Sequence, residues 1–79
     1  MILSYNVWPT VTPSDTVDFT RGLTQAIWVG GSGDVAAVAS NNVVTLFVAV
    51  PAGSWLPIAV RRINATATTA TGIVALYQN

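Results

Sequence analysis

Few residues of this 79-residue chain can take part in acid–base or nucleophilic chemistry, since the sequence has no His, Lys, Glu or Cys. Its charged residues are three Asp and three Arg: Asp15, Asp18, Asp34, Arg21, Arg61 and Arg62. A Ser or Thr nucleophile needs an adjacent base, and a carboxylate pair needs surroundings that raise one pKa. The sequence supplies neither, and the three Asp lack a metal-ligand spacing. We therefore predict no enzyme activity, no catalytic residues, no metal site and no cofactor.

A glycine-rich stretch, Gly30-Gly31-Ser32-Gly33, is the strongest local motif. A phosphate-binding loop would need a following Lys and a helix, whereas Asp34 follows here and repels phosphate. We interpret the stretch as a tight hairpin whose glycines supply positive φ angles. Three further turns are predicted, one of them a two-residue type I′ hairpin loop at the two asparagines. They involve Pro13, Asn41, Asn42, Pro51 and Gly53.

Arg61 and Arg62 are adjacent in a segment that favours a strand, so their side chains point to opposite faces. At least one of them is then half-buried, and a buried Arg requires a partner. We expect Asp18 or Asp34 to pair with one of these arginines, within the subunit or across a subunit boundary. The alternative is a pair of solvated arginines at a sheet edge.

Composition favours self-association. Apolar residues make up 52% of the chain and charged residues 8%, and the mean hydropathy is +0.58. A domain of this size buries only about 60% of the surface that its unfolded chain exposes. The net charge of zero and the absence of Lys argue against nucleic-acid binding. No residue from Val35 to Val60 is charged, but Asn and Pro interrupt this run, so no membrane-spanning helix is predicted.

The elements expected are short strands rich in Val, Ala and Thr, bounded by Gly, Pro, Asn and Ser. The prediction is an all-β fold, a small antiparallel β-sandwich or barrel of about six to seven strands. We expect residues 1–79 to form a single β-domain, with 1–13 as a candidate N-terminal arm or edge segment. The expected strands are 3–8, 16–20, 23–29, 34–40, 43–50, 55–63 and 64–77, with 23–50 forming a meander and a bulge at Gly72.

The predicted strand at 43–50 has two apolar faces. Val44, Leu46, Val48 and Val50 alternate on one face, and the other is scarcely more polar. An antiparallel strand with one wet face should alternate apolar with polar residues. We therefore expect one face to be covered by the core and the other by a second copy of the chain.

Aromatic residues are candidates for an oligomer or docking interface, since Trp and Tyr are favoured there. The candidates are Tyr5, Trp8, Trp28, Trp55 and Tyr77. Packing in the core is the other interpretation, and exposed Trp side chains could also stack on sugars.

Several stretches carry a resemblance to a known family. They are Thr12-Pro13-Ser14-Asp15-Thr16-Val17, Val29 to Ala36, Val50-Pro51-Ala52-Gly53, Leu56-Pro57-Ile58, Val60-Arg61-Arg62-Ile63 and Ala67 to Tyr77. In this order they resemble the small spike-base proteins of tailed phages and of related gene transfer agents. The family's N-terminal part is longer and more polar than residues 1–9.

The resemblance implies a virion structural protein, an oligomeric β-domain that forms the base of a head spike or fibre. It implies homo-oligomer contacts, other virion proteins as partners (the major capsid protein or a spike or fibre protein), and a location in a virion assembled in the host cytoplasm. It implies no catalysis. The alternatives are a capsid decoration (cement) protein that stabilises the shell and, from another class, a host-glycan-binding module.

Overall fold

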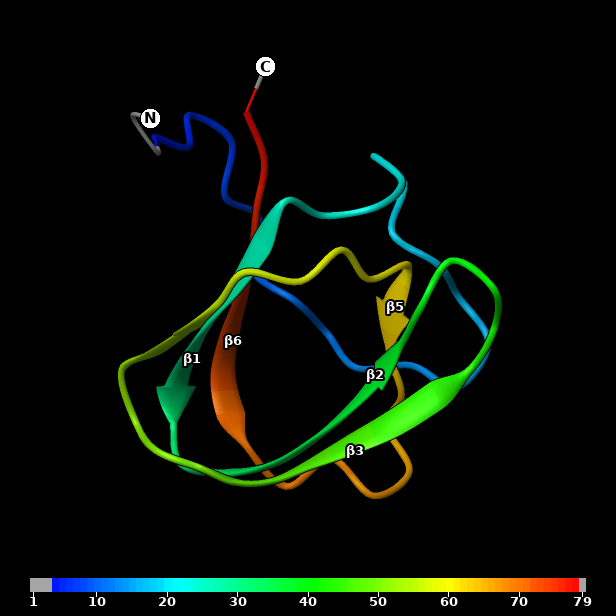
Figure 1. The fold of residues 1–79 in the computed structure, drawn as a ribbon, viewed down its shortest axis with the longest axis vertical. Helices are drawn as coiled ribbons and strands as arrows, with labels where there is room; N and C mark the ends of the chain where they lie inside the picture. Colours follow the sequence, from blue (N-terminus) through cyan, green and yellow to red (C-terminus); the bar gives the residue numbers. More distant parts are fainter. Residues whose placement is uncertain (1–3, 79) are drawn as a thin grey trace.

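The computed structural model describes residues 4–78, which contain six β-strands (Figure 1). The strands are β1 (Ala26–Gly31), β2 (Gly33–Val38), β3 (Val44–Val50), β4 (Ser54–Leu56), β5 (Arg62–Ile63) and β6 (Thr71–Leu76). They form two three-stranded antiparallel sheets with the orders β4-β1-β6 and β3-β2-β5. The prediction of a small antiparallel all-β fold is confirmed, with six strands where six to seven were expected.

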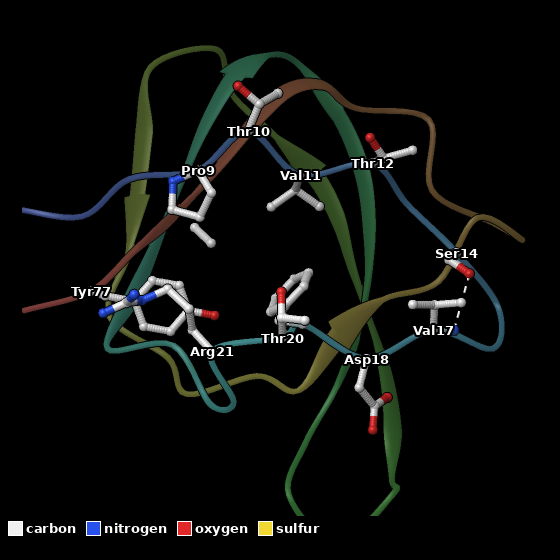
Figure 2. A pocket seen from close by; sticks show the side chains of 12 residues that line it. Pro9, Thr10, Val11, Thr12, Ser14, Val17, Asp18, Thr20, Arg21 and Tyr77 are labelled. Carbon is white, nitrogen blue, oxygen red and sulfur yellow. Dashed lines mark hydrogen bonds between the residues drawn. The ribbon is translucent and has the colours of Figure 1, made fainter.

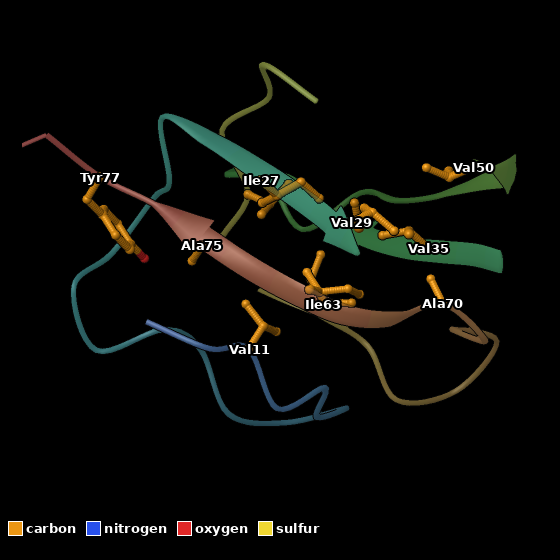
Figure 3. Packing of buried hydrophobic residues seen from close by; sticks show 12 residues of the cluster. Val11, Ile27, Val29, Val35, Val50, Ile63, Ala70, Ala75 and Tyr77 are labelled. Atoms are coloured by element: carbon orange, nitrogen blue, oxygen red, sulfur yellow. The ribbon is translucent and has the colours of Figure 1, made fainter. Parts of the chain in front are cut away.

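Both sheets contribute to one apolar core (Figure 3). In β1 the side chains alternate, with Ile27 and Val29 fully buried and Trp28 between them about two-fifths exposed. β2 and β5 contribute the fully buried Val35 and Ile63 from the second sheet. β-branched side chains pack well on such a pleated surface, and their burial is the main force that joins the two sheets.

The glycine-rich stretch is not a hairpin, which corrects the prediction. β1 and β2 lie in different sheets and do not pair, so the chain crosses between the sheets at Ser32. At Gly33 a Cβ atom would lie 2.5 Å from the Ala70 amide nitrogen. Glycine is therefore needed for a close passage of two chain segments, and the predicted 23–50 meander does not form.

The β2–β3 hairpin lies where the two asparagines predict it, with a different loop. The Ala39 amide donates to the Val43 carbonyl (3.0 Å), and the Asn42 amide donates to the Ala39 carbonyl (3.0 Å). Asn42 has a φ of 69°, whereas Asn41 does not have a positive φ. The loop is thus a three-residue connection with one left-handed residue, because a type I′ turn would need two.

The predicted 55–63 strand is two strands in different sheets. β4 ends at Leu56, directly before Pro57, and β5 begins at Arg62 in the second sheet. Proline cannot donate to a strand ladder, which explains the early end of β4. The turn before β4 is at the predicted place, with Gly53 at a φ of 78° and the Ser54 hydroxyl donating to the Pro51 carbonyl (2.6 Å).

Residues 16–20 form no strand, contrary to the prediction. The chain bends after Pro13, and the Ser14 hydroxyl oxygen accepts bonds from the amides of Thr16 (3.2 Å) and Val17 (3.1 Å). Such side-chain bonds compete with strand pairing.

The N-terminal segment follows β6 rather than forming a full strand. Val7 and Thr10 form isolated bridges with Tyr77 and Val74, and the Val11 amide donates to the Ile73 carbonyl (2.9 Å). The first three residues of the predicted arm or edge segment lie outside the described residues.

Candidate interaction surfaces

Three of the four outer sheet edges are closed by other parts of the chain or cut short. Residues 6–11 pair with β6, and the amides of Ser14 and Phe19 donate to the carbonyls of Ile63 and Arg61 beside β5 (both 2.9 Å). β4 has only three residues and is followed by Pro57. Covering and shortening are the usual protections of sheet edges.

The fourth edge, along β3, is open. β3 is the longest strand, and it pairs only with β2 among the described strands. Figure 1 shows it at the margin of the molecule. Because Ala39 and Val43 form a hydrogen-bonded pair, the alternation of an antiparallel ladder directs the amides and carbonyls of Val44 and Leu46 away from β2. These backbone groups can therefore pair with another chain.

The outer side chains of β3 form an exposed apolar row. Val44, Leu46 and Val48 are 50%, 43% and 67% exposed, and we call these three residues with the open strand edge the β3 stripe. Large exposed apolar patches mark interaction sites. Val50, which was expected on the same face, is buried in the core, so the exposed row ends at Val48. The covering of this row by a second copy stays a prediction.

Asp34 lies at the end of the β3 stripe. Its carboxylate accepts a bond from the Ala49 amide (2.9 Å), and Ala49 has a φ of 57° where the β2–β3 register shifts. The carboxylate thus holds an irregularity of β3 in place. Within residues 4–78, no arginine forms an ion pair with Asp34.

Asp18 lies between the two adjacent arginines. Its two carboxylate oxygens accept from the guanidinium groups of Arg61 (2.6 and 2.9 Å) and Arg62 (2.9 Å). Arg61 also donates to the Asn42 side chain (2.6 Å), and Arg62 to the Asn64 side chain (3.0 Å). The hydrogen bonds from Arg61 and then Arg62 lower the pKa of Asp18 below its ordinary value of 3.8. Of the two expected acids, the structure brings Asp18 to both arginines and Asp34 to neither.

Asp15 binds a different segment. Its carboxylate accepts from the amide (2.8 Å) and hydroxyl (2.7 Å) of Thr66, and these bonds lower its pKa. The contact fastens residues 13–16 to the loop that precedes β6.

The aromatic candidates separate into two groups. Trp28 and Trp55 lie directly opposite each other on β1 and β4, and both are about two-fifths exposed. Trp8 is exposed on the N-terminal segment, and Tyr5 is half-buried there. Because Trp28 and Trp55 are opposite each other in the ladder, their side chains lie on the same face of the sheet and form one aromatic surface.

Tyr77 is a core residue, which corrects its prediction as an interface residue. Its side chain is 6% exposed, and its hydroxyl donates to the Gly22 carbonyl (2.9 Å). Burial raises the pKa of the Tyr77 phenol, while the positive charge of Arg21 opposes this shift. The Arg21 guanidinium lies over the ring, 5.5 Å from its centre.

A groove of about 410 Å³ separates the N-terminal segment from residues 17–21 (Figure 2). Its walls include Pro9, Val11, Val17 and Phe19, and Arg21 and Tyr77 lie at one end. In the described part of the chain, no carboxylate forms an ion pair with Arg21. Sequence reasoning missed both the groove and Arg21, since the segments that form it are joined only by long-range contacts.

No three His, Cys, Asp or Glu residues within residues 4–78 are close enough to hold a metal ion. No helix in this part of the chain is long and apolar enough to cross a membrane.

The chain matches no model of a known protein family, and no curated protein matches its sequence. Among solved structures, it is similar to a chain in the capsid of a native gene transfer agent (GTA) particle that was computed with C5 symmetry. The two share 27% sequence identity with a TM-score of 0.83, and the match covers 92% of this chain and 83% of the other. The fold is thus shared with a chain of a GTA capsid.

Proposed function

We propose that this chain is a structural protein of a phage or GTA-like particle and forms the base of a head spike or fibre. The observation that carries the proposal is the similarity to a GTA capsid chain at a TM-score of 0.83 over 92% of this chain. The order of the sequence motifs from Thr12 to Tyr77 supports the spike-base assignment.

The surface chemistry supports an assembly role. Only six of 79 residues are charged, and the β3 stripe and the Trp28–Trp55 pair expose apolar surface on two different sheets. A subunit that contacts both its own copies and a shell or fibre needs at least two such surfaces. We assign the Trp28–Trp55 surface to another virion protein, because aromatic side chains are enriched at interface centres.

The test is incorporation into particles. Particles produced without this chain are mixed with the tagged protein and imaged by electron cryomicroscopy. Density at the foot of each spike or fibre is the expected result, and density spread over the shell faces would instead assign the decoration role. Absence of density from the particle would contradict both roles.

The Trp28–Trp55 assignment has its own matched control. Trp28→Ala should abolish incorporation without loss of the folded state, because it removes the centre of the aromatic surface. Leu23→Ala, at an exposed residue outside that surface, should incorporate normally. Equal incorporation of both variants would contradict the assignment.

The exposed Trp28–Trp55 pair also favours the glycan-binding alternative, since adjacent indoles can stack on a sugar. Titration of the protein with the host's surface polysaccharide decides between glycan binding and the structural role. A saturable change in Trp fluorescence that Trp28→Ala abolishes would support glycan binding, and the structural role predicts no change.

A further inference from the structure

The residues of the β3 stripe define what kind of surface could pack against it. The stripe of Val44, Leu46 and Val48 carries no charge, and Asp34 at its end is half-buried with no arginine paired to it in the described chain. A complementary surface should therefore be apolar and carry one positive charge at its end.

The groove on the same chain offers apolar side chains and one arginine, beside several hydroxyl side chains and the carboxylate of Asp18, which is already bonded to Arg61 and Arg62. Pro9, Val17 and Phe19 line it, and the guanidinium of Arg21 stands at its end over the Tyr77 ring. Within residues 4–78 the ion pairs join Asp18 to Arg61 and Arg62, and they leave out Arg21, Asp15 and Asp34. Asp15 is held by Thr66, so Asp34 is the acid at the β3 stripe that such a contact can use. Each chain thus has the β3 stripe with Asp34 and the groove with Arg21, two surfaces that could meet between copies.

The two halves lie in different parts of the molecule. In Figure 1 the segment around residues 20–23 is near the upper end, and the corner between β1 and β2, which precedes Asp34, is near the lower end. The longest dimension of the domain is 32 Å. A contact between unlike surfaces of identical subunits is head-to-tail, and it closes into a ring if the rotation permits.

We propose that the β3 stripe of one copy packs into the Arg21 groove of the next copy, with Asp34 of the first facing Arg21 of the second. The occupant of the stripe is a second copy of this chain. The inference deepens the proposed function by naming the contact between its subunits. It is tested on the purified protein alone, so that failure to enter particles would contradict the function and leave this contact standing.

Cysteine cross-linking tests the contact directly, because the chain has no cysteine. Asp34→Cys and Arg21→Cys proteins, distinguished by tags, are mixed and mildly oxidised. The mixed disulfide should exceed either self-linked dimer at least about tenfold, and Asn41→Cys in the exposed hairpin loop is the control for random collision. Self-linked Asp34→Cys dimers as the main product would overturn the proposal in favour of a two-fold contact between β3 edges.

A charge exchange gives the second measurement. Asp34→Arg and Arg21→Asp should each weaken association about 100-fold, since like charges then face each other, and the double variant should restore most of it. Asp34→Asn separates charge from local structure, because its amide oxygen still accepts from the Ala49 amide. An unchanged association of Asp34→Asn, or a double variant no better than the two single variants, would overturn the proposal.

Discussion

The β6 edge and the β3 edge of this domain are treated in opposite ways. Residues 6–11 cover β6 with backbone hydrogen bonds and bury Val11 in the core. Among residues 4–78, β3 pairs with β2 on one side only, and it exposes Val44, Leu46 and Val48. A chain of 79 residues thus uses its own N-terminal segment to close one edge and leaves the longest strand open. The covered β6 edge stabilises the subunit, and the open β3 edge is the one that the proposed contact between copies would use.

The largest expected effect is on association. Leu46→Asp places a charge in the centre of the β3 stripe and should weaken self-association at least about 100-fold, because an unpaired charge is costly to bury. The measurement is the concentration dependence of mass in sedimentation equilibrium. Leu23→Asp is the matched control, since Leu23 is 45% exposed against 43% for Leu46 and lies outside both the stripe and the groove lining. Equal weakening by both variants would contradict the account.

A Val→Ala substitution beside β6 and another on β3 distinguish residues that stabilise the subunit from residues that are free for assembly. Val11→Ala should lower the free energy of unfolding by about 2 kcal/mol, because Val11 is only 9% exposed and packs in the core. Val48→Ala, at a residue 67% exposed, should change it by less than about 0.5 kcal/mol in the dissociated subunit. Urea unfolding at low protein concentration measures both. Equal losses would show that the open edge is not free in the subunit.

The smallest expected effect is on the pH dependence of stability, through the Asp18 contact with Arg61 and Arg62 at the β5 edge. The pKa of Asp18 is lowered in the folded protein by Arg61 and Arg62, so its contribution to stability is present above its ordinary value of 3.8 and is lost as pH falls through the lowered folded pKa. Asp18→Asn should be less stable than the wild type at pH 6, and the difference should narrow below pH 3.8. The measurement is the urea midpoint of unfolding of the wild type and of Asp18→Asn across this pH range. A difference that does not vary with pH would contradict this assignment.

Local chemistry predicted the parts of the fold that depend on neighbouring residues. The asparagine pair located the β2–β3 hairpin, and Pro51 with Gly53 located the turn before β4. The same signals failed at Gly30 to Gly33, because a hairpin and a crossing between sheets need similar residues. What distinguishes them is the close approach of Ala70 to Gly33, which lies far along the sequence.

The sequence predicted an ion pair because it contains few acidic residues that could pair with an arginine. With only three Asp for two adjacent Arg, the Asp18 contact was one of two expected pairings. Tyr77 was misassigned because an apolar ring with a polar tip suits both an interface and a core position whose hydroxyl reaches a carbonyl, here that of Gly22. The Arg21 groove joins residues 9–21 to residues near 75–77 and left no local signal.

The most direct test of the account is the solution mass of the purified protein by light scattering across a range of concentrations. An open β3 edge that accepts a second copy predicts a closed oligomer, a defined multiple of the 8.2 kDa subunit. A well-folded monomer at every concentration would contradict the claim that the β3 edge is a contact between copies.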